Sequence, residues 1–347
     1  MTSAETNRRV HLVGTVPAES TKEALNLVSK SVGDRITDWL PDGETGSRKN
    51  WIGRLVESLG THPDLELAKE GDWSDYESTP GFKVKKDHEF TSVDLDYFEH
   101  FEASWPEFQE ARSELGRPDL AFQVGIPGPV DVSFAAFGFN PLTGFKHAKP
   151  FEEATVREIE KIHAVAGDQV VYQLEVPIEV EVINRLPSPL RAQGARWLAR
   201  RVLRVVEGSP RGSRWGFHLC VGDMNNKAFS KLRDTGTVTH LANALVSQFP
   251  SGRKLEFVHM PLAHGSIPPT TDPKFYAPLM NLHLPAEVRL IAGLSHERQS
   301  REDQEKVRSI VEVMVGHPVD IAASCGLGRR DPEAATANLK RSRDLTD

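Results

Sequence analysis

Short apolar runs alternate with longer amphipathic segments along most of the chain. The apolar runs, such as residues 121–125 before Pro127-Gly128-Pro129, end at turn residues and indicate buried strands. The segments between them repeat apolar residues every three or four positions, which predicts helices with one buried face. The expected strands are residues 10–14, 35–40, 121–125, 170–175, 215–220, 254–258, 287–292 and 319–322.

The amphipathic segments carry helix start and stop signals. Ser20 and Thr21 cap the first segment, and Gly167 stops the one that begins near residue 151. The segment at 301–316 shows the spacing most clearly, with five apolar residues on one face. The expected helices are residues 21–30, 48–60, 151–166, 187–207, 237–249, 301–316 and 332–343.

The alternation of strands and helices predicts the fold class. Each expected strand is followed by at least one helix, which implies parallel pairing. Eight such units close into a (β/α)8 barrel. We therefore predict an α/β protein with a single (β/α)8 TIM barrel spanning residues 1–347. A doubly wound open sheet is the alternative, but no Gly-x-Gly-x-x-Gly follows the first expected strand.

Residues 61–118 interrupt this rhythm after the second expected strand. The segment is acidic and carries nine aromatic residues between Trp73 and Phe108. Disordered linkers are poor in aromatics, so we expect an ordered insertion. It is predicted to contain a β-hairpin near 82–92 and a helix near 94–115. A lid over a pocket and a dimer contact are both compatible with it, although core packing accounts for most of the rings.

Composition excludes several classes of protein. The chain has 347 residues, is 39% hydrophobic and carries a net charge of −7, so it offers no basic surface for nucleic acid. No stretch approaches the roughly 18 apolar residues of a membrane span, and the N-terminus has no apolar run. With only two cysteines the chain is not a disulfide scaffold. We expect a soluble cytoplasmic protein.

The two cysteines lie where strands end. His218 and Cys220 are two positions apart on one strand, so they share a face and form half of a tetrahedral zinc site. Cys325 follows the last expected strand, and Glu256 lies in the strand between. One imidazole, two thiolates and a carboxylate suit zinc, provided that the two cysteines lie within about 6 Å of each other. The predicted ligands are His218, Cys220, Glu256 and Cys325.

These residues resemble a known family. His218-Leu219-Cys220, with Asn225 five residues beyond, resembles the zinc-binding His-x-Cys segment of cobalamin-independent methionine synthase. Glu256, and Cys325 in Ser-Cys-Gly-Leu-Gly-Arg, resemble the third and fourth zinc ligands of that family. The resemblance implies a zinc enzyme that activates a small thiol as a zinc thiolate for methyl or other alkyl transfer.

The resemblance extends to residues that would bind substrate. Val13-Gly14-Thr15-Val16-Pro17 is similar to the Gly-Ser-x-Pro turn of the family, and Asp42-Gly43-Glu44 to its His-Gly-Glu turn. Glu175, before Val176-Pro177, stands in place of an aspartate, and His296 falls near the histidine proposed as a proton donor. The implied substrate-binding residues are Thr15, Asp42, Glu44, Glu175 and Asn225.

Some features depart from the family. Its full-length enzymes have two tandem barrels, whereas this chain has room for one. The alkyl donor is therefore left open between a folate, a corrinoid and another small molecule, and a homo-oligomer is possible. Because zinc with four protein ligands is normally closed, we expect Glu256 to leave the metal when substrate enters. His296 would then protonate the leaving group.

Two other functions remain open at this stage. A metal-free lyase like uroporphyrinogen decarboxylase has the same barrel, and a zinc-stabilised interaction protein would need no substrate. Individual residues also have plainer interpretations. The cysteines could be core thiols, Glu256 an ion-pair partner, Glu44 a turn residue, Thr15 a helix cap and Glu175 the partner of an arginine.

The rim holds further candidates. His296 lies in a charged run and could be a surface residue, with His259, His264 or His283 in its place. Arg329 and Arg330 either begin the last helix or bind an anion at the barrel mouth.

Overall fold

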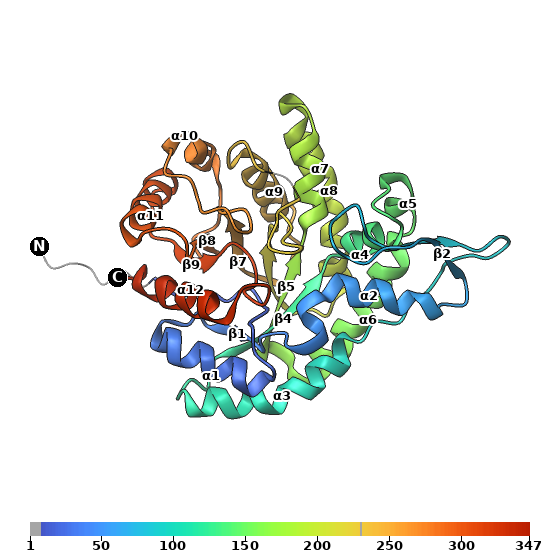
Figure 1. The fold of residues 1–347 in the computed structure, drawn as a ribbon, viewed down its shortest axis with the longest axis horizontal. Coiled ribbons are helices and arrows are strands. Elements are labelled where there is room, and N and C mark those ends of the chain that lie inside the picture. Colours follow the sequence, from blue (N-terminus) through green and yellow to red (C-terminus); the bar gives the residue numbers. More distant parts are fainter. Residues whose placement is uncertain (1–7, 230) are drawn as a thin grey trace, which may run out of the picture.

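A curled sheet of parallel strands, surrounded by helices, forms the centre of the computed structural model, which describes residues 8–229 and 231–347 (Figure 1). The strands follow the order β1-β4-β5-β6-β7-β8-β9, and each neighbouring pair is parallel. They are β1 (Trp39–Pro41), β4 (Ala121–Pro127), β5 (Val170–Glu175), β6 (Arg214–His218), β7 (Lys254–Pro261), β8 (Arg289–Ser295) and β9 (Asp320–Ala323).

The segment around Val10 closes this sheet into a barrel. Val10 forms parallel bridges with Ile36, just before β1, and with Ile321 in β9. The backbone N–H of His11 donates to the Ile321 carbonyl at 2.9 Å, and the N–H of Val10 donates to the Arg35 carbonyl at 2.7 Å. The first of the eight expected strands is therefore present as a single residue, Val10, that bridges to the segment before β1 and to β9. The predicted TIM-barrel fold class is confirmed.

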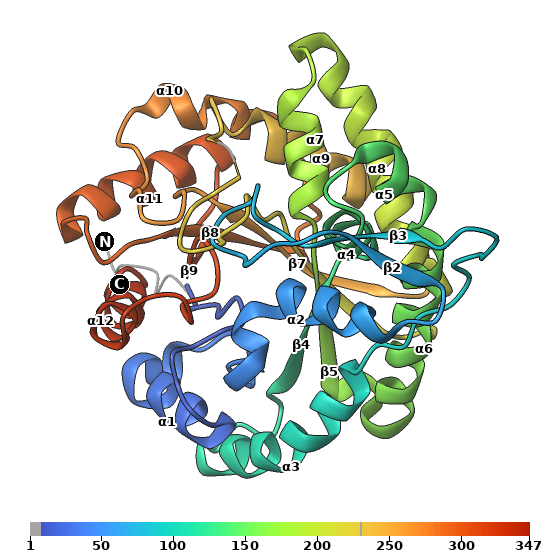
Figure 2. The same cartoon turned by 45° about the vertical axis from the view of Figure 1, so that its right-hand side comes forward.

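Helices surround the strands on the outside of the barrel (Figure 2). The helices are α1 (Thr21–Val32), α2 (Trp51–Ser58), α3 (Tyr97–Glu114), α4 (Pro129–Ala136), α5 (Pro141–Lys146), α6 (Ala148–Ala166), α7 (Pro177–Arg185), α8 (Ser188–Gly208), α9 (Gly236–Ser247), α10 (Pro273–Tyr276), α11 (Arg301–Val315) and α12 (Pro332–Asp344). Ser20 caps α1 by accepting from the N–H of Glu23, as its position in the sequence predicts. In the described residues no helix combines the length and hydropathy needed to span a membrane.

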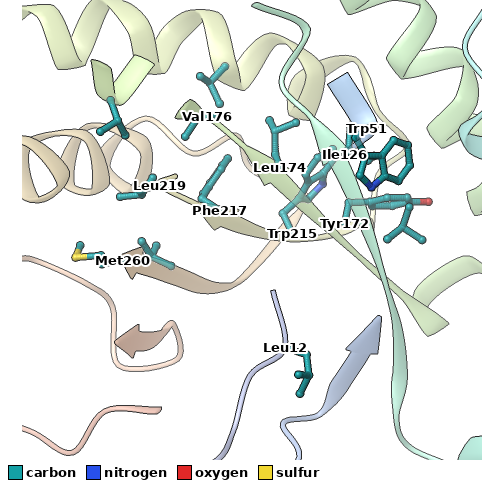
Figure 3. Packing of buried hydrophobic residues seen from close by; sticks show 14 of the residues in the cluster. Leu12, Trp51, Ile126, Tyr172, Leu174, Val176, Trp215, Phe217, Leu219 and Met260 are labelled. Carbon is teal, nitrogen blue, oxygen red and sulfur yellow. The ribbon is translucent and has the colours of Figure 1, made fainter. Parts of the chain in front are cut away.

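The main core lies between the strands and the helices. Trp215 and Phe217 of β6 point outward into it and lie close to Tyr172 and Leu174 of β5 (Figure 3). The rings of Trp215 and Tyr172 are 5.2 Å apart. These side chains are fully buried, as expected for strands covered by helices on their outer face.

A second, smaller core fills the inside of the barrel. It contains one side chain from each of six strands, namely Trp39, Ala121, Val171, Phe257, Ile291 and Ala322. The ring of Phe257 lies against Gly216 of β6, where a Cβ atom would come within 2.1 Å of the ring. Gly216 therefore makes room for the aromatic ring that closes this layer.

The insertion after β1 differs in detail from the prediction. Its hairpin pairs β2 (Leu65–Lys69) with β3 (Gly81–Val84), so the expected hairpin at 82–92 is wrong. Only Leu65 is buried in β2. Because the strand is exposed, it lacks the apolar run from which a strand is predicted. The expected helix at 94–115 is α3, which packs against α1 and α6 and so belongs to the outer ring of helices.

We predict that Gly216→Ala lowers the free energy of unfolding by about 1 to 3 kcal/mol, because the added methyl group displaces the Phe257 ring. Denaturant titration measures the change. Gly60→Ala is the control, since its new Cβ would have only an ordinary 4.0 Å contact with Phe82. Equal stability of Gly216→Ala and the wild type would show that the inner layer is loosely packed.

Candidate functional site

A polar layer lies inside the barrel between the inner apolar core and the mouth. The indole N–H of Trp39 donates to His11 Nδ1 at 2.9 Å, which leaves His11 Nε2 as the donor to Gln173 Oε1 at 3.0 Å. The Gln123 side-chain amide donates to the carbonyls of Leu12 and Val13. This network ties the first segment of the barrel to β4 and β5.

The His218 and His259 pair continues this layer at the ends of β6 and β7. The Nδ1 atoms of the two rings are 2.6 Å apart, so one carries a proton and the other accepts it. His259 Nε2 lies 3.0 Å from the carbonyl oxygen of Ala323 and must donate to it. Burial lowers the pKa of both histidines and keeps both rings neutral.

The tautomer of His218 follows from these contacts. His259, protonated on Nε2, accepts at Nδ1, so His218 carries its proton on Nδ1. The Nε2 of His218 is then unprotonated and has a free lone pair. This buried atom has no hydrogen-bond partner among the described residues. A neutral imidazole oriented in this way is what a metal ligand requires.

Two thiols stand beside this imidazole. The sulfurs of Cys220 and Cys325 are 3.8 Å apart, and a ligand atom of His218 lies within 4.8 Å of both. Both cysteines are free. The contact with Cys325, together with burial, raises the pKa of the Cys220 thiol, so a nearby cation is needed to hold the thiolate form.

The three side chains fit a zinc ion. Two thiolates at 2.3 Å from a tetrahedral zinc lie about 3.8 Å apart, which is the spacing found here. The unpartnered His218 Nε2 supplies the nitrogen ligand that accompanies thiolates in such sites. Three protein ligands with a fourth position free are typical of catalytic zinc rather than structural zinc.

Glu256 is not the fourth member of this group. It lies near the start of β7, where it forms ion pairs with Arg214 Nε at 2.6 Å and with Lys254 Nζ at 3.0 Å. Trp215 pairs with Leu255 and Gly216 with Phe257, so Glu256 is the extra residue at a register shift between β6 and β7. The predicted role of Glu256 as a zinc ligand is wrong. The expectation that Glu256 leaves the metal when substrate enters is therefore wrong as well. The ion-pair interpretation is the one that the structure supports.

A cavity of about 470 Å³ opens above the thiols at the barrel mouth. Its walls come from α2, from α4, from the end of β5 and the start of α7, and from residues 220–229 after β6. One further wall is residues 72–78 of the insertion, called the strap below. The ionisable side chains that border it are Arg54, Glu57, Asp72, Asp131, Glu175, Tyr76, Cys220, Asp223, Cys325 and Arg329.

The strap is fastened to the loop after β6. The Tyr76 hydroxyl accepts from the Met224 N–H at 2.9 Å and donates to the Lys227 carbonyl at 3.0 Å. The Asn225 side-chain amide donates to the carbonyls of Trp73 and Ser74. Asn225 borders the cavity as expected of a substrate-binding residue, but its amide N–H groups hold the strap.

Buried carboxyl groups lie near the thiols. Burial raises the pKa of Glu175 to about 7, and burial with the neighbouring Glu175 and Asp42 charges raises the pKa of Glu44 to about 8. Glu44 Oε1 has no hydrogen-bond partner in the described chain, and its carboxyl group fits between Gly14 and Gly125, where a Cβ atom would collide with it. Asp131 joins them, with one oxygen capping Ile178 N–H and the other unpartnered among the described residues.

Asp42 and Thr15 do not border the cavity but hold neighbouring turns in place. Asp42 accepts from the N–H of Glu44 and pairs with Arg48 at 2.6 Å, which fixes the turn that carries Glu44. The Thr15 hydroxyl accepts from the Gly328 N–H at 3.2 Å, which ties the first turn to the loop after Cys325. The alternative interpretation of Thr15 as a helix cap is wrong, since Ser20 caps α1.

His296 is placed away from the cavity. Its Nδ1 accepts from the Arg298 N–H at 3.1 Å, and its Nε2 lies 3.2 Å from the Gly265 carbonyl. Both ring nitrogens are therefore engaged in local structure, and the ring does not border the cavity. The geometry gives no support to a role of His296 as proton donor. Among the alternatives, His259 is the one that contacts the three-residue group.

We predict that Tyr76→Phe speeds amide hydrogen exchange in the strap about fivefold, because two hydrogen bonds between the strap and the loop after β6 are lost. Exchange followed by mass spectrometry measures it. Tyr276→Phe is the control, since this hydroxyl bonds Thr270 elsewhere. Unchanged exchange in residues 72–78 would mean that other contacts hold the strap.

We predict that His259→Phe weakens zinc binding about 10- to 100-fold, because His218 loses the acceptor that sets its tautomer. Competition with a chromogenic chelator measures the affinity. His264→Phe removes a histidine that bonds the Leu232 N–H and should leave the affinity unchanged. Equal affinity of His259→Phe and the wild type would refute the assigned tautomer.

Comparisons with known proteins agree with the geometry of the fold. No protein-family model matches the chain, and no curated protein shows significant sequence similarity to it. Among solved structures, a B12-independent methionine synthase from Shewanella sp. W3-18-1 in complex with selenomethionine is similar, with a TM-score of 0.60 and 14% identity over 97% of this chain and 96% of that chain.

A second similar structure is the putative vitamin-B12 independent methionine synthase from Listeria monocytogenes. Its TM-score is 0.55 at 12% identity, covering 94% of this chain and 85% of that chain. At such identities the likeness is one of fold. The chain thus has a barrel of the kind found in B12-independent methionine synthases.

Proposed function

We propose that the protein is a zinc-dependent transferase that moves a methyl or other alkyl group onto the sulfur of a small thiol. The observation that carries this proposal is the group of His218, Cys220 and Cys325, whose ligand atoms lie within 4.8 Å of one another at the floor of a cavity. The similarity of the fold to B12-independent methionine synthases supports the same chemistry.

His218, Cys220 and Cys325 would hold the zinc. When bound, zinc would lower the pKa of an acceptor thiol and keep its sulfur nucleophilic at neutral pH. Because Glu256 is engaged at the other end of β7, no protein carboxylate needs to leave before a substrate enters.

The carboxyl groups beside the thiols supply the remaining functions. Glu44 and Asp131 each present an unpartnered buried oxygen, and burial raises the pKa of both groups, so an ammonium group on the substrate would favour their ionised forms. Glu175 borders the cavity, and burial raises its pKa to about 7, so it retains a proton near neutral pH. Glu175 is therefore the group best placed to protonate the leaving group as the new sulfur–carbon bond forms.

The strap limits the access of water to the reaction. Trp73 and Tyr76 cover the cavity from the side of the insertion, and Tyr76 stacks on Phe229 with ring centroids 3.9 Å apart. The cavity accommodates a small thiol and the reactive end of a donor, which is proposed to be a methylated folate or a methylated corrinoid.

We predict that the purified chain binds about one zinc and that Cys220→Ser and Cys325→Ser each lose most of it, because each removes a thiolate ligand. Metal analysis by mass spectrometry measures the content. Glu256→Gln is the matched control and should keep its zinc.

The same variants test the reaction. Methylation of homocysteine or 2-mercaptoethanol, with methylcobalamin or a methylated folate as donor, should require zinc and should be lost in both cysteine variants. Full zinc content in both cysteine variants, or loss of zinc in Glu256→Gln, would contradict the ligand set. A wild-type chain with no zinc would favour a metal-free lyase.

A further inference from the structure

Arg329 is a cation in the same cavity as the two sulfurs. It lies four residues after Cys325 and borders the cavity together with both cysteines. The turn that carries it is held in place by Thr15, whose carbonyl accepts from Leu327 N–H at 2.7 Å and whose hydroxyl accepts from Gly328 N–H. The position of the Arg329 backbone relative to Cys325 is therefore fixed from two sides.

The guanidinium of Arg329 has one charged neighbour but leaves N–H groups available for a ligand. The only ion pair it forms within the described residues is to Asp223, with Nη1 and Oδ2 3.6 Å apart, which is longer than a hydrogen bond. The Arg329 side chain is 24% exposed and borders the cavity, whereas the Asp223 side chain is 1% exposed, so the guanidinium is accessible from the cavity. The neighbouring Arg330 is different, because Nε contacts both oxygens of Glu297 at 3.2 and 3.3 Å.

Groups of both signs border the cavity. Glu175 and Asp131 border it at the end of β5 and on α4, and Asp223 borders it beside Arg329. Arg329 borders it on the side of the loop after β9. The other arginine that borders the cavity, Arg54, is paired with Asp96, so Arg329 is the guanidinium available to an anion that enters next to the sulfurs.

We propose that Arg329 binds the acidic group of the acceptor thiol, so that the preferred acceptors are small thiols carrying a carboxylate or a similar anion. This inference rests on the proposed function. A guanidinium presents parallel N–H donors that match the two oxygens of a carboxylate. Because Arg329 and the sulfurs line one cavity, one short molecule reaches both with its two ends. The acid then fixes the orientation in which the sulfur is presented to the donor.

The test compares matched thiols on the zinc-loaded full chain by calorimetric titration, without any alkyl donor. The thiols are 3-mercaptopropionate, which is acidic, 3-mercapto-1-propanol, which is neutral, and cysteamine, which is cationic. In the wild type the acid should bind about tenfold more tightly than the alcohol. Cysteamine should not share this advantage.

Substitutions at Arg329 should remove this preference. Arg329→Met should weaken binding of 3-mercaptopropionate about tenfold and change binding of 3-mercapto-1-propanol less than twofold. Arg329→Lys should keep part of the preference, because it retains the charge and loses the paired donors. Arg54→Met is the matched control, since it removes another arginine that borders the cavity, at its outer wall and paired with Asp96. Zinc content, measured in parallel, should stay near one in all three.

Two results would overturn the inference and leave the proposed function standing. One is equal affinity of the wild type for the acid and the alcohol, and the other is an equal loss of both in Arg329→Met. If no thiol bound to the zinc-loaded wild type, the proposed function would fail and this inference with it.

Discussion

The contact between the sulfurs of Cys220 and Cys325 depends on the closed ring of parallel strands. The two residues are 105 positions apart in the chain, yet their sulfurs are 3.8 Å apart. They follow β6 and β9, which are separated in the ring only by β7 and β8. Because all these strands are parallel, their carboxyl ends lie at the same mouth, and the residues that follow them converge there.

The interior of the barrel prepares the imidazole of this site. The neutral His259 is held by the Ala323 carbonyl, and it in turn holds the Nδ1 proton of His218. The cost of burying these polar rings is offset because each nitrogen except His218 Nε2 has a partner. A buried, unprotonated nitrogen beside two thiols is an arrangement that a cation can complete. The hydrogen bonds of the chain thus support the proposed metal site without reference to any relative.

Much of the fold could be predicted because its signals are local. The runs at 170–175 and 319–322 are short and apolar and lie between helical segments, and they form β5 and β9 with small shifts of their ends. The hairpin of the insertion could not be found in this way. The exposed β2 buries only Leu65, and its pairing with β3 depends on contacts that leave no periodic pattern.

The site was predictable in part for the same reason. Alternation along one strand put His218 and Cys220 together, and the ends of parallel strands brought Cys325 to them. The prediction for Glu256 was wrong because this residue lies near the start of β7, at a register shift against β6 that no pattern in the sequence indicates. The strap and the Arg329–Asp223 pair depend on loop conformations, which side-chain patterns do not encode.

These observations support the proposed metal site of three side chains, whose remaining position would face a cavity bordered by acid groups and by Arg329. X-ray absorption at the zinc edge of the purified chain tests this claim most directly. The account predicts two sulfur ligands at about 2.3 Å and one imidazole nitrogen at about 2.0 Å, with a light atom in the fourth position. A shell made only of oxygen and nitrogen, or one with a single sulfur, would contradict it.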